Sequence, residues 1–171
     1  MVMIQIIQKK FTKAEAKVMQ SEIRQVPDIT GYSLRELLRL KTIFKAFVSD
    51  EFAGACANFD FGRNWTELSA YIVFAKYRSQ GIGKLLFQNA YNDAIDSGRN
   101  IYIVSRNPAM IKIFKRKNFQ IITSFWKLPF EVIVHEIIFA ASSIYRIKEF
   151  LRKLPMKKSG KFIFGVKPVH S

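Results

Sequence analysis

The chain has little of what several classes of protein require. Cys56 is its only cysteine, so an intrachain disulfide and a cysteine-based zinc cluster are both excluded. The two histidines, His135 and His170, lie far apart and have no metal-ligand spacing around them, and the sequence therefore predicts no bound metal. We expect Cys56 to be a small buried hydrophobic residue on a strand rather than a reactive thiol.

Long apolar runs are also missing. The opening segment MVMIQIIQKK is too short for a secretory signal and has no small-residue cleavage site, so a cytoplasmic protein is expected. Residues 130–154 are rich in apolar side chains, but Glu131, His135 and Glu136 interrupt them. A span of the bilayer needs roughly 18 uninterrupted apolar residues, and this segment is therefore not expected to be one.

Positive charge is in large excess. The 171 residues include 28 Lys and Arg but only 13 Asp and Glu, which gives a net charge of +15. The electrostatic field of so much positive charge attracts anions, so RNA or an anionic membrane surface could be a partner. The alternative is a basic surface that is only solvated. With 49% hydrophobic residues and 16 Phe, the chain is long enough for one folded domain, predicted to cover residues 1–171.

Periodicity and turn signals predict a mixed α/β order: strand, two helices, three strands, helix, strand, helix, strand, a further helix and a final strand. Thr12-x-x-Glu15 and Ser33-x-x-Glu36 are capping boxes that open the first two helices. Asn107 caps a later helix, whose first residue is Pro108. The expected strands are 3–7, 42–48, 52–61, one beginning at Trp65, 101–104, 119–128 and 162–166.

Residues 130–154 are predicted to form one long helix before a basic turn, 157–161, and the last strand. We expect it to pack on the sheet or on a second subunit, which would make the protein a homodimer. The alternative is an amphipathic helix that lies on an anionic membrane, because Arg146, Lys148, Arg152 and Lys153 follow the apolar part.

A basic, glycine-containing turn follows the strand that ends near Phe74. Arg78-Ser79-Gln80-Gly81-Ile82-Gly83 leads into a helix expected to bury Leu85, Leu86, Ala90 and Ala94. Glycines at a helix start allow close approach of a ligand, and the free N–H groups there attract phosphate oxygens. A nucleotide P-loop is disfavoured, because Lys84 is followed by Leu85 rather than Ser or Thr.

Arg78-x-x-Gly81-x-Gly83 resembles the acetyl-CoA signature of the GNAT superfamily of N-acetyltransferases. The strand ELSAYIV precedes it, and SRNPAMIKIFKRKNF, similar to the family's Asn-capped fourth helix, follows one strand later. The resemblance implies an α/β (α+β) GNAT-like fold: a mixed, twisted sheet of about seven strands with helices on both faces. The helix at about 130–154 would be an insertion.

The resemblance also implies coenzyme A binding. The pyrophosphate would meet the N–H groups of the turn, and the pantetheine arm would lie between residues 71–75 and 101–105, where the two central parallel strands of the family diverge. The cofactor-binding residues implied are Ile72, Val73, Phe74, Arg78, Ser79, Gln80, Gly81, Ile82, Gly83, Lys84, Asn107 and Phe114.

The activity implied is direct transfer of an acetyl group from acetyl-CoA to a primary amine. Glu67 is the first candidate for general base, against the alternative of a solvent-facing charge at a strand start. A backbone N–H near Ile72 or Val73 would stabilise the developing negative oxygen. A small metabolite amine, a protein amine and an aminoacyl-tRNA all remain open as acceptors.

Phe114 departs from the family, which commonly has a Tyr there to protonate the leaving thiolate. Either Tyr71, Tyr102 or Ser105 replaces it, or solvent protonates the thiolate. Asn118 replaces a usual Gly, but Asn tolerates the left-handed conformation that a helix end needs. With the basic cluster from Lys112 to Lys117, the missing hydroxyl keeps open a non-catalytic acyl-CoA-binding or RNA-binding module on the same fold.

Overall fold

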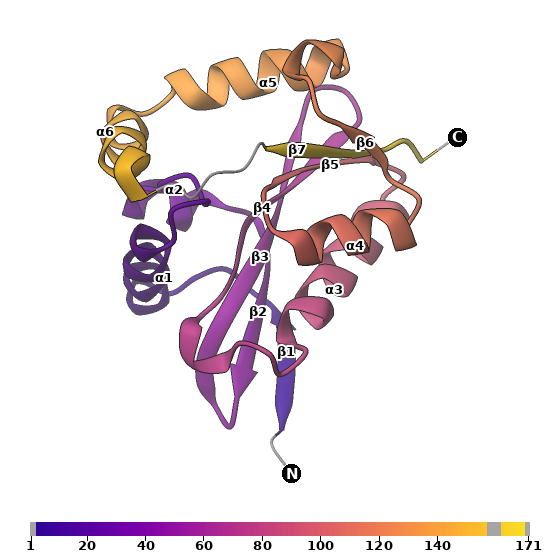
Figure 1. The fold of residues 1–171 in the computed structure, drawn as a ribbon. Helices are drawn as coiled ribbons and strands as arrows, with labels where there is room; N and C mark the ends of the chain where they lie inside the picture. Colours follow the sequence, from indigo (N-terminus) through magenta and orange to yellow (C-terminus); the bar gives the residue numbers. More distant parts are fainter. Residues whose placement is uncertain (1–2, 157–161, 170–171) are drawn as a thin grey trace.

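A mixed sheet of seven strands forms the centre of the molecule (Figure 1). The computed structural model describes residues 3–156 and 162–169, and the predicted basic turn at 157–161 lies outside them. The strand order is β1-β2-β3-β4-β5-β7-β6, and every neighbouring pair is antiparallel except β4 and β5. The strands are β1 Ile4–Gln8, β2 Thr42–Val48, β3 Glu51–Phe61, β4 Trp65–Val73, β5 Asn100–Ser105, β6 Gln120–Ile122 and β7 Ile163–Lys167.

Helices cover both faces of this sheet. In Figure 1, α1, α2 and α6 lie together on one side of the strands, α3 and α4 lie on the other, and α5 crosses the upper end. The helices are α1 Lys13–Gln25, α2 Leu34–Arg39, α3 Ile82–Asp96, α4 Pro108–Arg116, α5 Phe130–Ala141 and α6 Ile144–Lys153. This arrangement confirms the expected fold class. Within the described ranges, no helix has the length and apolar character needed to cross a bilayer.

Local sequence determines where several helices begin. Thr12 accepts from the N–H of Glu15 at 3.2 Å, and the Glu15 carboxylate accepts from the N–H of Thr12 at 2.7 Å. Ser33 and Glu36 repeat this reciprocal pair at α2. Asn107 Oδ1 accepts from the N–H of Ala109 at 2.9 Å at the start of α4. All three predicted caps are therefore confirmed.

The main core lies between the sheet and the helices on its faces. Met19 of α1 and Leu86 and Ala90 of α3 are completely buried. Leu85 was expected on the same face as Leu86, but it is 41% exposed, because neighbouring helical positions point about 100° apart. Cys56 is buried as expected, and burial raises the pKa of its thiol.

The strand expected at 119–128 is much shorter. Only β6 pairs, and it pairs with β7, which begins at Ile163 opposite Ser105 of β5. Ile122 faces Phe164 of β7, so little of the partner strand remains for the residues that follow. A 3-10 turn, η2 Phe125–Lys127, takes their place and ends just before Pro129.

The single long helix expected at 130–154 is two helices. Ser142 Oγ donates to the carbonyl of Phe139 at 2.8 Å, and Ser143 Oγ accepts from the N–H of Arg146 at 3.4 Å. Serine hydroxyls that bond to nearby backbone compete with helix continuation, so the pair ends α5 and caps α6.

A second, smaller core lies under α5. Val132 of α5 packs with Trp65, Tyr102 and Val166, which come from β4, β5 and β7. Glu131 accepts from the indole N–H of Trp65 at 3.0 Å. The helix is thereby fixed over the point where the parallel pair meets β7.

Candidate active site

The parallel strands β4 and β5 run together only at their starts. Their pairing consists of Trp65 with Asn100, Thr66 with Ile101 and Glu67 with Tyr102. Beyond Glu67, β4 stays paired with β3, and β5 stays paired with β7. Ala70 has a φ of +46°, and the β3–β4 register shifts nearby, as expected of a bulge that increases local twist. The two strands therefore part after Glu67. The family resemblance implied a gap between residues 71–75 and 101–105, but Ile101 and Tyr102 are still paired with Thr66 and Glu67. That the gap receives the pantetheine arm remains a prediction.

The turn after β4 leaves the first N–H groups of α3 available. Gly81 is the N-cap, with a φ of +82°, and no side chain among the described residues caps this end. A Cβ at Gly81 would meet nothing within 4 Å, so the backbone conformation, not space, calls for glycine. Arg78 lies beside the turn and donates to the carbonyl of Val73 at 3.2 Å. Uncapped N–H groups and a cation suit an anionic diphosphate.

Tyr71 joins β4 to the first turn of α3. Its hydroxyl donates to the carbonyl of Gly83 at 2.6 Å, and a Cβ at Gly83 would lie only 3.1 Å from that hydroxyl oxygen. Gly83 is thus needed for this close approach. Burial raises the pKa of Tyr71, so its proton stays on the phenol.

Three other predicted residues have structural roles at the start and inner face of α4. Ser105 Oγ accepts from the N–H of Asn107 at 3.0 Å, and Asn107 caps the helix. Phe114 is completely buried, and its ring lies so close to Gly165 of β7 that a Cβ there would come within 2.9 Å. The contacts predicted between these residues and a ligand remain predictions.

Glu67 is buried and held by a histidine of α5. Its side chain is 6% exposed, and its Oε2 lies 2.8 Å from His135 Nε2. The His135 ring stacks on Phe61 with 3.8 Å between ring centroids. The alternative of a solvent-facing charge at a strand start therefore does not hold.

Glu136 and Tyr102 continue this polar cluster. Burial, and then the neighbouring Glu67 carboxylate, raise the pKa of Glu136 to about 7. Tyr102 is completely buried, and burial together with the nearby Glu136 carboxylate raises the pKa of its phenol. Two carboxyl groups, an imidazole and a phenol thus meet at the last paired position of β4 and β5.

The sequence did not identify His135 and Glu136 as site residues. One signal was available: a His and a Glu stand side by side within an apolar run. Such residues would be buried, and buried polar groups need hydrogen-bond partners, so the pair indicated a polar cluster inside the protein. Ligand atoms of Glu67, His135 and Glu136 lie within 4.8 Å of one another, so these three could hold a divalent cation. The hydrogen bond from His135 already gives the Glu67 carboxylate a partner, so the carboxylate does not need a cation. The expectation that no metal is bound remains a prediction.

A pocket of about 170 Å³ lies beside this cluster. Ser69 opens onto it, two residues after Glu67 on β4 and therefore on the same face. Tyr32, Phe59 and Phe139 give it aromatic walls, and the ion pair of Glu36 and Arg146, 2.6 Å apart, lies at its side. An apolar pocket with a few fixed polar groups is typical of a small-molecule site.

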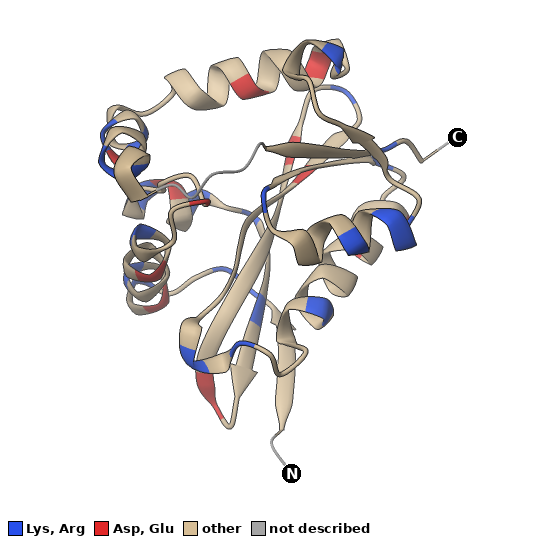
Figure 2. Cartoon of the chain, in the orientation of Figure 1, with Lys and Arg blue, Asp and Glu red and all other residues tan. Residues whose placement is uncertain are grey.

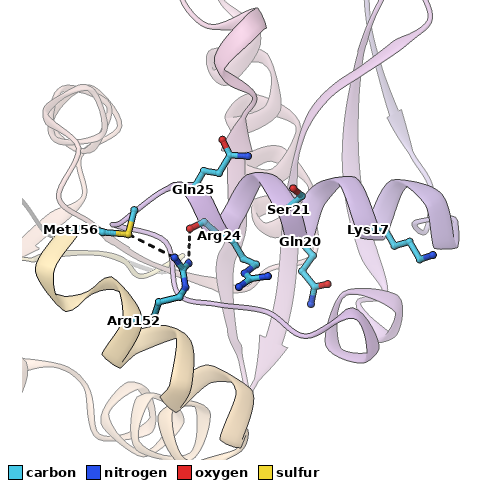
Figure 3. A pocket seen from close by; sticks show the side chains of 7 residues that line it. All are labelled: Lys17, Gln20, Ser21, Arg24, Gln25, Arg152 and Met156. Atoms are coloured by element: carbon cyan, nitrogen blue, oxygen red, sulfur yellow. Dashed lines mark hydrogen bonds between the residues drawn. The ribbon is translucent and has the colours of Figure 1, made fainter.

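A larger hollow of about 470 Å³ lies between α1 and the end of α6 (Figure 3). Its polar side chains extend along α1, and Arg152 reaches across from α6 to donate to the carbonyl of Arg24 at 2.6 Å. None of the site residues predicted from the sequence lines it.

Comparisons with known proteins show the family and the fold of the chain. The model of the acetyltransferase (GNAT) family matches residues 5–119. A comparison with curated protein sequences finds no match.

Among solved structures, N-acetylglutamate synthase from Neisseria gonorrhoeae, complexed with coenzyme A and N-acetyl-glutamate, has a TM-score of 0.69 at 14% identity. The match covers 99% of this chain but only 36% of that one. Rv2747 from Mycobacterium tuberculosis, in complex with CoA and NLQ, has a TM-score of 0.65 at 15% identity over 92% of this chain and 97% of that one.

The ribosomal-protein-S18-alanine N-acetyltransferase from Escherichia coli has a TM-score of 0.63 at 13% identity over 99% of this chain and 96% of that one. At such identities the shared feature is the fold. Because the family model spans well over half of the sequence, the chain belongs to the GNAT family of acetyltransferases.

Proposed function

We propose that the chain is an N-acetyltransferase that moves the acetyl group of acetyl-CoA to a primary amine. The observation that carries the proposal is the buried Glu67 carboxylate, fixed by His135 where β4 and β5 part. The proposal draws on family membership, and coenzyme A in the Neisseria and Mycobacterium structures supports the choice of acyl donor.

The turn and the start of α3 would hold the diphosphate of acetyl-CoA. N–H groups from Ser79 to Lys84 donate to the phosphate oxygens, and Arg78 and Lys84 add positive charge. The separated ends of β4 and β5 would receive the pantetheine arm, with Asn107 beside it. Acetyl-CoA supplies an activated acyl thioester there.

The 170 Å³ pocket would receive the acceptor, since Ser69 and Phe59 connect it to Glu67 and His135. Glu67 accepts a proton from the ammonium group, directly or through one water, and His135 keeps the carboxylate oriented. As the new C–N bond forms, a β4 N–H near Ile72 or Val73 donates to the carbonyl oxygen, which gains negative charge. The C–S bond then breaks, and the nitrogen releases its second proton to water as the amide forms.

Water protonates the departing thiolate in this scheme. Phe114 has no proton to give, and the proton of Tyr71 is held on the Gly83 carbonyl. Ser105 is occupied at the start of α4, and Tyr102 faces Glu136. Of the predicted catalytic residues, Glu67 thus keeps a direct role, while Tyr71, Tyr102 and Ser105 support the strands and helix around it.

Release of free thiol from acetyl-CoA, measured over a panel of amines, tests the proposal. Glu67→Gln should lower turnover by about 100-fold or more, because the base is removed, while CoA affinity measured by calorimetry stays within about twofold. Glu22→Gln on α1 makes the same charge change away from the cluster and should retain turnover. Tight CoA binding without turnover on any amine would instead identify a non-catalytic acyl-CoA-binding module.

A second candidate is an RNA ligand, either as a bound partner or as an aminoacyl-tRNA acceptor. Lys112, Lys115 and Arg116 are exposed on α4, where Figure 2 shows a basic stretch, and the net charge is +15. Gel mobility with tRNA at rising salt tests it, since binding through phosphates weakens steeply with salt. Unchanged mobility at low salt would exclude this candidate.

A further inference from the structure

Helix α6 turns its charged residues toward the protein. Arg146, Glu149 and Lys153 are 4%, 5% and 2% exposed. Arg146 pairs with Glu36 of α2 at 2.6 Å. Lys153 donates to the carbonyls of Ile23 in the last turn of α1 and of Val26 and Ile29 just after it, at 2.6 to 2.9 Å. These contacts are specific, so the orientation of the helix about its axis is fixed.

As a result, apolar side chains of α6 face outward. Several of α5 do so as well, because Val132 and His135 are buried on its other side. Figure 1 shows both helices at the periphery of the molecule. We call the following set the outer apolar face: Phe130, Ile137 and Ile138 of α5 and Ile144, Ile147 and Leu151 of α6, which are 47% to 78% exposed. Trp126, just before α5, is 78% exposed as well. An exposed apolar patch of this kind usually marks a site of interaction with a protein or a membrane.

The charges around this face have one sign. Between residues 125 and 156 the exposed charged side chains are Lys127, Lys148 and Arg152. The acidic residues of the same stretch are half-buried or buried, and each has a partner: Glu131 accepts from the indole of Trp65 and the backbone N–H of Arg63, Glu136 lies near Tyr102, and Glu149 accepts from Arg152. Such a face is complementary to an anionic membrane: the apolar and aromatic side chains match the acyl chains, and the basic side chains around them match the anionic lipid headgroups. In a dimer formed through this face, the same basic side chains of the two copies would be brought together.

We propose that the outer apolar face docks on an anionic membrane surface, with α5 and α6 lying at the level of the headgroups. The aromatic and aliphatic side chains enter the boundary between headgroups and acyl chains, and Lys127 and Lys148 pair with lipid phosphates. Docking does not depend on the proposed acetyl transfer, because it uses the sides of α5 and α6 that face away from His135 and the pocket.

Sedimentation of the full chain with vesicles tests the proposal. Vesicles of phosphatidylglycerol and phosphatidylcholine should bind the protein, and vesicles of phosphatidylcholine alone should bind it weakly. The double variants Ile137→Glu with Ile138→Glu, and Ile147→Glu with Leu151→Glu, should each weaken partitioning by about tenfold or more. Lys127→Gln with Lys148→Gln should weaken it by about fivefold per lysine.

Val18→Glu with Leu38→Glu is the matched control. These residues are 45% and 39% exposed on α1 and α2, away from the outer apolar face, and the pair should bind vesicles like the wild type. Circular dichroism checks that every variant is folded. Equal binding to neutral vesicles, or wild-type binding by both double variants, would overturn the proposal. So would a dimer in light scattering that the same variants dissociate, together with no vesicle binding.

Discussion

Helices α3 and α6 are amphipathic in opposite senses. α3 buries Leu86, Ala90 and Ala94 against the sheet, whereas α6 buries Arg146, Glu149 and Lys153 against α1 and α2. The burial of apolar area is a non-directional source of stability, but buried ions require good geometry and complete hydrogen bonding. The part matched by the family model is therefore held by its main core, α5 by the smaller core beneath it, and α6 by a few directed contacts.

The sharpest test of this contrast replaces one leucine in each helix. Leu86 is completely buried and Leu151 is 58% exposed. Leu86→Ala should lower the free energy of unfolding by about 3 kcal/mol, because it leaves a cavity in the core. Leu151→Ala should change it by less than about 0.5 kcal/mol. Urea unfolding measures both, and equal losses would contradict the outward orientation of α6.

A smaller effect should come from the buried ammonium group of α6. Lys153→Met removes the donor that serves three carbonyls of residues 23–29, and it should cost about 2 kcal/mol of stability. Lys148→Met makes the same change at an exposed position of the helix and should be nearly neutral. If the two variants were equally stable, directed contacts would not be what holds α6.

The smallest effect concerns the polar cluster where the two regions meet. The pKa of Glu136 is raised to about 7 from an ordinary value of 4.5. A raised pKa in the folded state means that the folded protein binds the proton more tightly. The stabilisation is therefore complete below pH 4.5 and is lost as the pH rises through about 7.

Glu136→Gln removes this titration. Its stability relative to wild type should rise by about 1 to 2 kcal/mol between pH 5 and pH 8, after allowance for partial solvent access. Asp50→Asn, at an exposed turn, controls for the change in net charge. Parallel stability curves for Glu136→Gln and wild type would show that Glu136 is no more buried than an ordinary surface carboxylate.

The fold of residues 3–119 was predictable because its signals are local. Capping boxes, an Asn-Pro helix start and glycine turns act within a few residues, and the parallel pairing of β4 and β5 follows from the helix between them. The end of β6 depends instead on the length of β7, which lies some forty residues later.

The same distinction applies to the site. The turn from Arg78 to Gly83 could be recognised in the sequence, since its residues are contiguous. The partner of Glu67 could not, because His135 lies 68 positions away on an element whose break at Ser142 and Ser143 was missed. The inward charges of α6 likewise pair with residues more than 100 positions earlier, beyond the reach of any periodicity.

The bond from Tyr71 to Gly83 has an electronic consequence for α3. The Gly83 carbonyl belongs to the peptide unit that carries the N–H of Lys84, so a phenol that donates to this oxygen withdraws electron density from that nitrogen. The Lys84 N–H becomes more acidic and a better partner for an anion. In this way a neutral side chain of β4 adjusts the polarity of the first turn of α3.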